Sequence, residues 1–514
     1  MKIKMPKLYP TVVHMLDEAA RLSPEHLALV HDEESLNYKE YAACVSGLAR
    51  KLKVEGIGEG DRVAVVMKNS LDVAIATLAV QAAGAQLVPL NPLYTATELQ
   101  PIFTNAQVKG VLLDAGCAAT VQAALPQYAE LFYLEISENY RLTQWKKEEY
   151  LAQLLPLPAA DGLSTLQYTG GTTGIPKGVS LSHKSISINV SQREALLPTN
   201  IEQEKILIIT PLFHIYAVSM GLYLGVYCRS TLYILDRYHP ETTLEAIAKH
   251  KITLLSASPT IYISLMSFDQ FSNYDLSSIR VSFSGSAALS EEVIRRWEQR
   301  TGSMVCEGYG QTEAGPILTY NPSIGKRKIG SVGIPVPDTE VEIVDVETGE
   351  SRLPQGEHGE IRARGWQIMN GYRGLEIETQ EALKDGWLHT GDIGYFDEEG
   401  YLYICDRKKE MVIVSGFNVY PREIEDAVFA HPDIAEVAVI GAKDSYRGEK
   451  LIAFVKSKNT SLTTNELADF LESRLVAYKV PKEIYFLEKI PKTAVQKIDK
   501  KKLKEIYEEK LFVS

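Results

Sequence analysis

The sequence has few cysteines, and they lie far apart. Its 514 residues contain five: Cys44, Cys117, Cys228, Cys306 and Cys405. No two of them form a Cys-x-x-Cys pair, so the spacing argues against a zinc site and against a disulfide framework. The residues before Pro10 also lack the apolar run of a secretory signal. A reducing compartment suits this pattern, and we expect a cytoplasmic protein.

Long apolar runs are also missing. The longest, Val73–Leu90, is interrupted by Gln81, Gly84, Gln86 and Pro89. A membrane-spanning helix needs about 20 predominantly apolar residues. We therefore interpret this stretch as a buried helix followed by a strand, and the sequence predicts no membrane span.

Basic residues are fewer than acidic ones. The chain has 54 Lys and Arg against 66 Asp and Glu, a formal net charge of −12 at pH 7 and an isoelectric point near 5.5. This balance argues against a nucleic-acid partner, which would require a basic stripe. The basic run Lys497–Lys504 has two interpretations. It is either a solvated helix face or a site of peripheral contact with anionic lipid.

The chain has the composition of an ordinary globular protein, with 45% hydrophobic and 23% charged residues. Arg62–Met67, Ser70–Gly84 and Gln86–Leu90 have strand, helix and strand character, which predicts a βαβ unit with a parallel sheet. The same alternation recurs and predicts an α/β body with helices on the sheet faces. Further strands are expected at 206–209, 231–235, 253–256 and 281–284, and helices at 241–251 and 291–301.

The pattern changes after Tyr320, where glycine and proline separate short β-type runs. We predict a β-rich subdomain over about 321–405. A charged stretch, Asp406–Lys409, follows and is interpreted as a hinge. The remainder, 410–514, is long enough for a smaller, mobile α+β domain. Its expected strands are 437–440, 451–455 and 484–487, and its expected helices are 421–430 and 464–475. The large N-terminal domain is then 1–405.

A loop rich in glycine and threonine is the strongest chemical signal. Glycine lets backbone N–H groups point into one concavity that suits phosphate oxygens, and Lys177 adds a positive charge. Pro176 precedes that lysine, so the loop is not a Walker A motif. The alternative interpretation is a flexible surface loop. The glycines and threonines of this loop are the six consecutive residues Thr169, Gly170, Gly171, Thr172, Thr173 and Gly174.

Two weaker signals follow. The run Glu307-Gly308-Tyr309-Gly310-Gln311-Thr312-Glu313 places a carboxylate beside a hydroxyl, and these groups suit magnesium and a phosphate. Asp392, in Trp387–Asp392, is a candidate acceptor for the hydroxyls of a ribose. Taken alone, Glu313 could be a solvated side chain and Asp392 a turn residue.

These motifs occur in a fixed order that ends at Lys497. Because of these motifs and their order, the sequence resembles the adenylate-forming superfamily. Acyl- and aryl-CoA synthetases, non-ribosomal adenylation domains and beetle luciferases belong to it. The stretch Gln167–Gly171 is most similar to that of bacterial medium- and long-chain fatty acyl-CoA synthetases. The resemblance implies ATP, Mg²⁺ and coenzyme A as reactants or cofactors. It also implies a small-molecule carboxylic acid as substrate, activated as acyl-AMP and then transferred to coenzyme A.

The resemblance implies roles for individual residues. Thr169 to Lys177 bind the β- and γ-phosphates, Thr312 contacts the α-phosphate, Glu313 holds magnesium and Tyr309 stacks on adenine. His214 lies near the acyl carboxylate, or is an ordinary histidine of the core or surface. Lys497 supplies positive charge when the small domain closes, and that domain then rotates about Lys409. The remaining implied contacts are Gly285, Ser286, Ala287, Glu307, Gly308 and Gly310 for the nucleotide, Asp392 and Arg407 for the ribose, and Ser415, Gly416 and Phe417 for coenzyme A.

One departure concerns Lys497. The family usually has glycine before this lysine, whereas here Val495 and Gln496 precede it, which removes backbone freedom. Lys500 is the alternative lysine. If neither acts, the protein is a non-catalytic binder of ATP and acyl groups.

The acid itself stays open. Gly310 replaces a tryptophan of acetate-specific relatives, and we interpret it as leaving an open channel for a larger acid. A fatty acid is the leading prediction. An aryl-CoA ligase and an enzyme that loads a carrier protein are the alternatives. Both a monomer and a homodimer are compatible with the sequence.

Overall fold

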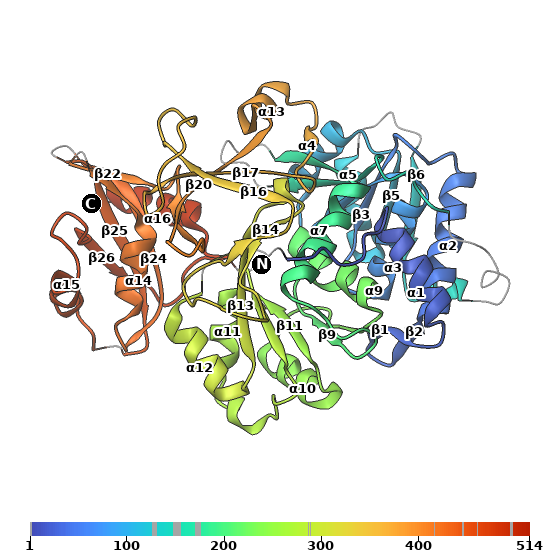
Figure 1. Cartoon of the computed structure of the whole chain (residues 1–514), viewed down its shortest axis with the longest axis horizontal. Coiled ribbons are helices and arrows are strands. Elements are labelled where there is room, and N and C mark those ends of the chain that lie inside the picture. The colour runs from blue at the N-terminus through green and yellow to red at the C-terminus, as the bar shows by residue number, and fades with distance from the viewer. Residues whose placement is uncertain are drawn as a thin grey trace.

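The computed structural model describes residues 3–125, 131–146, 156–169, 176–285, 287, 289–415, 417–444, 447–459, 461–493 and 497–513. Within these ranges the strands form four sheets of nine, seven, five and five strands. In Figure 1 the colour runs from blue to orange over the first three sheets, and the fourth lies in the orange-to-red part at the left. The mixed α/β class and the smaller second domain agree with the sequence-based prediction.

The first sheet has a parallel centre. Strands β13 to β1 run parallel, and antiparallel strands flank them at both edges. In spatial order the strands are β15 (Ile334–Pro335), β14 (Ile317–Tyr320), β13 (Met304–Gly310), β12 (Val281–Ser284), β11 (Leu254–Ala257), β9 (Lys205–Ile208), β10 (Thr231–Ile234), β1 (Leu27–His31) and β2 (Glu34–Asn37). One face is covered by α10 (Pro240–His250), α11 (Pro259–Met266) and α12 (Glu291–Thr301), at the bottom of Figure 1.

The second sheet is also largely parallel. The antiparallel pair β7 and β8 carries the two ends of the predicted phosphate loop, because Thr169 pairs with Lys177. In order the strands are β18 (Gly371–Tyr372), β8 (Lys177–Ser182), β7 (Leu163–Thr169), β4 (Gln86–Leu90), β3 (Arg62–Val66), β5 (Gly110–Asp114) and β6 (Phe132–Ile136).

A layer of helices fills the space between these two sheets. Its side chains join strands of both sheets in one core, which contains Val63 and Val65 of β3 and Phe283 of β12. The layer comprises α1 (Val12–Leu22), α2 (Tyr38–Val54), α3 (Leu71–Ala82), α7 (His183–Leu196) and α9 (Leu224–Cys228). The outer face of the second sheet packs against α4 (Ala96–Ala106) and α5 (Ala118–Ala124). The body is therefore built of five alternating layers.

Helix α3 explains the interrupted apolar stretch. The Ser70 hydroxyl caps it by accepting from the Val73 N–H, and every residue of the helix is buried. Its Gln81 is buried too, and donates to Ser164 and Tyr223. Among the described residues, no helix combines the length and apolar character that a membrane crossing requires.

The third and fourth sheets form the β-rich part and the core of the smaller domain. The third contains β16 (Thr339–Val344), β17 (Gly359–Gly365), β19 (Leu383–Lys384), β20 (Trp387–Phe396) and β21 (Leu402–Arg407), with α13 (Glu376–Ala382) beside it. The fourth contains β22 (Val412–Val414), β23 (Phe417–Val419), β24 (Ile434–Asp444), β25 (Gly448–Ser457) and β26 (Glu483–Phe486). Helices α14 (Pro421–Phe429), α15 (Thr464–Glu472) and α16 (Lys500–Val513) pack around the fourth sheet, which has its own apolar clusters.

Candidate active site

The carboxyl ends of β12 and β13 meet the third sheet at the candidate nucleotide site. Tyr309, near the end of β13, donates from its hydroxyl to Asp392 Oδ2 at 2.6 Å. Asp392 pairs with Arg407 across β20 and β21, and Arg407 Nε lies 3.6 Å from Asp392 Oδ1. Burial raises the pKa of Asp392, whereas the Arg407 charge lowers it. The structure thus brings together three residues that the sequence assigned to adenosine.

The C-terminal domain contributes Lys497 to this site. Burial and the positive charge of Arg407 together lower the pKa of Lys497 to about 8, and Asp392 acts in the opposite direction. Lys500, the alternative lysine, instead pairs with Glu410 at 3.1 Å and Glu425 at 2.8 Å. Of these two lysines, Lys497 is the one beside the predicted ribose-binding residues.

The backbone on both sides of residues 494–496 is held together. Val495 and Gln496 themselves lie outside the described residues. The Thr493 N–H donates to the Lys497 carbonyl at 2.7 Å, and the Lys497 N–H donates to Thr493 Oγ1 at 3.3 Å. An antiparallel bridge also joins Lys492 to Ile498. These bonds fix the position of Lys497 although no glycine precedes it.

His214 lies close to Lys497 and is neutral at pH 7. Burial lowers the pKa of His214 to about 4, and the nearby charge of Lys497 contributes in the same direction. The Tyr216 N–H donates to His214 Nδ1 at 3.2 Å, so the neutral ring carries its proton on Nε2. A neutral Nε2–H group is a donor suited to a carboxylate oxygen.

His214 is followed by an unbroken helical segment that includes a π-helix. It consists of α8 (Ile215–Ala217), the π-helix Val218–Tyr223 and α9. The Tyr216 ring packs against Gly285, where a Cβ would lie 2.8 Å from Tyr216 Cε2. A side chain larger than glycine would therefore force the ring away. Ser286 lies outside the described residues, and Ala287 is exposed.

At the predicted phosphate end, Tyr372 lies between two charged groups. Its hydroxyl donates to Glu313 Oε1 at 2.8 Å, and Lys177 Nζ lies 4.8 Å from its ring centroid. Thr312 and Glu313 begin a 3₁₀ turn one residue after β13 ends. Thr169 lies opposite Lys177. The intervening Gly170, Gly171, Thr172, Thr173 and Gly174 lie outside the described residues.

Glu307, Gly308 and Gly310 have local packing roles. Glu307 accepts the Leu289 N–H at 3.0 Å, and burial raises the pKa of Glu307 to about 7. A Cβ at Gly308 would lie 2.6 Å from the Tyr320 ring. A Cβ at Gly310 would lie 1.8 Å from the Pro316 carbonyl oxygen. The interpretation that Gly310 leaves an open channel is therefore corrected, because backbone occupies that space.

The predicted hinge and coenzyme A residues lie outside this cluster. Lys409 is exposed in the turn between β21 and β22. Ser415 has a positive φ of 53°, and Gly416 lies outside the described residues. Phe417 is 54% exposed and stacks on Tyr478 with ring centroids 4.6 Å apart.

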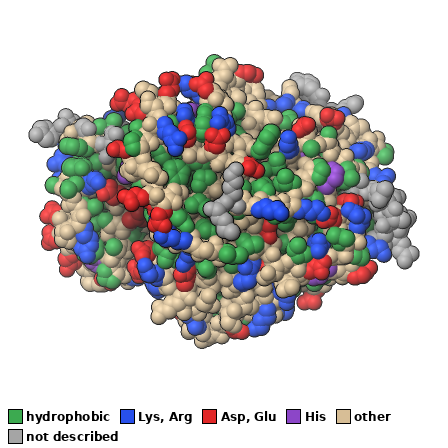
Figure 2. Space-filling model, viewed as in Figure 1, with side chains coloured by type: hydrophobic (Ala, Val, Ile, Leu, Met, Phe, Trp, Pro, Cys, Tyr) green, Lys and Arg blue, Asp and Glu red, His purple; other side chains and the backbone are tan. Residues whose placement is uncertain are grey.

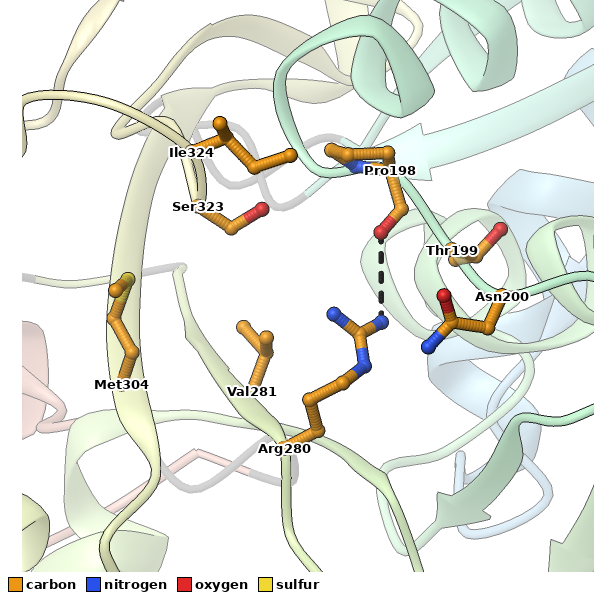
Figure 3. A pocket seen from close by; sticks show the side chains of 8 residues that line it. All are labelled: Pro198, Thr199, Asn200, Arg280, Val281, Met304, Ser323 and Ile324. Carbon is orange, nitrogen blue, oxygen red and sulfur yellow. Dashed lines mark hydrogen bonds between the residues drawn. The ribbon is translucent and has the colours of Figure 1, made fainter.

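A cavity of about 350 Å³ lies at the opposite end of the strands of the first sheet, beside their amino termini. Figure 3 shows Val281 and Met304, at the amino ends of β12 and β13, among its lining residues. Arg280 donates to the Pro198 carbonyl there and pairs with Glu204. This cavity is separate from the cluster around Lys497.

Figure 2 shows acidic and basic side chains interspersed over the visible face.

Two residues with strong contacts were missed by sequence reasoning. Tyr372 is in a two-residue strand, and Tyr216 was overlooked beside His214. The sequence Asn370-Gly371-Tyr372 carries no periodic signal. Its relation to Glu313 and Lys177 depends on strand pairing between distant segments.

The described geometry is that of a two-domain α/β protein whose candidate nucleotide site lies where its domains meet. The model of the AMP-binding enzyme family matches residues 16–373, and that of the AMP-binding enzyme C-terminal domain matches residues 423–497. The chain therefore belongs to the AMP-binding enzyme family.

Curated relatives and solved structures are similar over nearly the whole chain. A long-chain-fatty-acid–CoA ligase of Bacillus subtilis strain 168 is 39% identical, over 98% of this chain and 95% of the relative. ATP-bound MatB from Rhodopseudomonas palustris has a TM-score of 0.88 at 29% identity, covering 97% and 99% of the two chains. The anthranilate CoA ligase AuaEII in complex with anthranoyl-AMP has a TM-score of 0.89 at 25% identity, covering 98% and 99%.

Proposed function

We propose that this protein is an AMP-forming acid–thiol ligase. It activates a carboxylic acid, by preference a medium- to long-chain fatty acid, with ATP to give acyl-AMP and pyrophosphate. It then transfers the acyl group to the thiol of coenzyme A, which gives acyl-CoA and AMP. The observation that carries the proposal is the half-buried position of Lys497 beside Asp392, Arg407 and His214.

The first half-reaction brings together two anions, the carboxylate and ATP. His214 donates its Nε2–H to the carboxylate and orients it, while Lys497 offsets the negative charge at the α-phosphate. Asp392 accepts hydrogen bonds from the ribose, and Tyr309 lies against the adenine. The carboxylate oxygen attacks the α-phosphorus, the bond to the bridging oxygen breaks, and pyrophosphate leaves with that oxygen.

The residues at the phosphate end fit a magnesium ion. Mg²⁺ is usually held by one or two carboxylates together with substrate phosphates and water. Glu313 supplies such a carboxylate, and Tyr372 orients it at 2.8 Å. When bound, the ion offsets charge on the leaving pyrophosphate. Lys177 provides a second positive charge for the same phosphates.

The second half-reaction needs another face of the C-terminal domain. We infer that rotation about Lys409 withdraws Lys497 and brings Ser415, Gly416 and Phe417 toward the acyl-adenylate. The exposed Phe417 ring would then line the path of the pantetheine arm. The coenzyme A thiol attacks the acyl carbon and loses its proton, and AMP leaves. A cytoplasmic location suits the five unpaired cysteines.

The curated relatives favour a fatty acid as the substrate. Long-chain-fatty-acid–CoA ligases of Bacillus subtilis and Escherichia coli are 39% and 34% identical to this chain. An aromatic acid is the second candidate, because a 4-coumarate-CoA ligase of Narcissus pseudonarcissus is 31% identical. The flat Tyr216 ring beside Gly285 would suit an aromatic substrate as well as an alkyl chain.

The proposal is tested by pyrophosphate release with ATP and magnesium. The acids run from acetate to palmitate and include benzoate and cinnamate, each with and without coenzyme A. We expect release with the longer straight-chain acids that increases when coenzyme A is present. Release only with the aromatic acids would favour the second candidate. Absence of release with every acid would contradict the proposed ligase.

A further inference from the structure

Tyr372 contacts both charged residues at the predicted phosphate end. Its hydroxyl donates to Glu313 Oε1 at 2.8 Å, and Lys177 Nζ lies 4.8 Å from the centroid of its ring. The ring face attracts a cation, and the hydroxyl donates to an anion. A single side chain therefore contacts a positive and a negative group through its two different ends.

The backbone around Tyr372 is held to both partners. Tyr372 pairs with Val179 of β8, the strand that begins at Lys177, and the Arg373 N–H donates to the Gly178 carbonyl at 2.8 Å. The Met369 N–H donates to the carbonyl of Glu313 at 2.8 Å. These bonds join the start of β8 to the turn after β13. They fix the place of the Tyr372 ring between Lys177 and Glu313.

This arrangement keeps opposite charges apart. In the described part of the chain, Lys177 contacts the ring and makes no salt bridge with Glu313. A direct ion pair would neutralise the ammonium and the carboxylate that phosphate and magnesium need. We propose that Tyr372 is a positioning residue that holds Lys177 and Glu313 separately in readiness for magnesium-ATP.

The hydroxyl also orients the carboxylate. A hydrogen bond on Oε1 restricts the rotation of the Glu313 group and leaves Oε2 for another ligand. Residues that orient a metal-binding carboxylate in this way typically change metal affinity or activity by about 10- to 100-fold when mutated. This inference rests on the proposed function, because it requires that the site take magnesium and ATP.

The test measures nucleotide binding without any acid. Calorimetry with a methylene analogue of ATP, titrated over a range of magnesium concentrations, is compared for the wild type and Tyr372→Phe. The variant keeps the ring but loses the hydroxyl. We expect the magnesium concentration for half-maximal binding to rise by about 10- to 100-fold. Affinity for AMP measured without magnesium should stay unchanged.

Two further variants make the test specific. In a Glu313→Gln background, Tyr372→Phe should cause no additional change in magnesium dependence, because the hydroxyl acts through Glu313. Tyr401→Phe is the matched control, because the Tyr401 hydroxyl donates to the Lys326 carbonyl instead. It should behave as the wild type.

Three results would overturn the proposal. They are an unchanged magnesium requirement in Tyr372→Phe, an equal effect of that change in the Glu313→Gln background, and a parallel loss of AMP affinity. The last result would indicate a general structural role. Acid-dependent pyrophosphate release by the wild type tests the proposed ligase separately, since the binding measurement contains no acid.

Discussion

The C-terminal domain has two faces in contrasting environments. Lys497 is half-buried beside Asp392 and Arg407, where desolvation and the Arg407 charge lower its pKa to about 8. Phe417 on the other face is 54% exposed, and Ile413, in the adjoining strand β22, is 47% exposed. One face therefore completes the candidate nucleotide site while an apolar surface of the same domain remains in water.

This difference suits a domain that serves two half-reactions in turn. Exposing a large apolar side chain forgoes about 1.5–3 kcal/mol of burial free energy. Phe417 offsets part of that loss by stacking on Tyr478. Under the proposed function, the described arrangement would serve the adenylation half, and the exposed Phe417 ring would be available for the thioester half. A substitution on one face should therefore affect only one half-reaction.

The largest expected effect comes from Lys497→Ala. Removal of this charge should lower acid-dependent pyrophosphate release by about 100- to 1,000-fold, as loss of a group that stabilises transition-state charge commonly does. Transfer from chemically prepared acyl-AMP to coenzyme A should stay within about twofold of the wild type. Lys500→Ala is the control variant for Lys497→Ala, because Lys500 instead pairs with Glu410 and Glu425. Equal loss in both half-reactions would show that the two faces are not separate.

The second prediction concerns pH. A lowered lysine pKa means that the positive charge is present below about pH 8 and is lost as the pH rises through that value. His214, with a pKa of about 4, stays neutral over the same range. The value of kcat/KM for adenylation should fall by about 30-fold between pH 7 and pH 9.5.

Lys497→Arg provides the control for this profile. Arginine stays protonated over the whole range, so its profile should be flat up to pH 9.5 even if the rate is lower. A fall of the same shape in the arginine variant would assign the titration to another group.

The elements that sequence reasoning placed well are those with local signals. The strand, helix and strand around Ser70 fall within a residue or two of β3, α3 and β4, because periodicity and a capping serine define them. Asp392 and Arg407 were both expected at the ribose. Their direct pairing depends on the register of β20 and β21, which no local pattern specifies.

Other features required the three-dimensional structure. Tyr372 is in a strand of two residues that pairs with β8, almost two hundred positions earlier in the sequence, so neither period nor propensity marks it. Gly310 was interpreted as empty space, whereas the Pro316 carbonyl lies where its side chain would be. A small residue indicates close packing as readily as it indicates a channel.

A third prediction addresses the exposed face. Phe417→Ala removes the stack on Tyr478 and the apolar surface that we assign to the pantetheine path. Transfer from acyl-AMP to coenzyme A should slow by about tenfold, since an aromatic contact contributes about 0.5–1.5 kcal/mol beyond its area. Pyrophosphate release during the first turnover should be unchanged. Val476→Ala, also exposed in this domain at 53%, is the control. Slower adenylation in Phe417→Ala would contradict the assignment.

The smallest expected effect tests how Lys497 is held on its face. Thr493→Val keeps the side-chain shape but removes the Oγ1 that accepts the Lys497 N–H at 3.3 Å. Loss of one such bond costs about 1 kcal/mol, which corresponds to about fivefold slower adenylation. The remaining bond, from the Thr493 N–H to the Lys497 carbonyl, limits the loss. Thr242→Val, at an exposed position in the first turn of helix α10, should leave the rate unchanged. If Thr493→Val slows thioester formation as much as adenylation, Thr493 supports the whole domain rather than the position of Lys497.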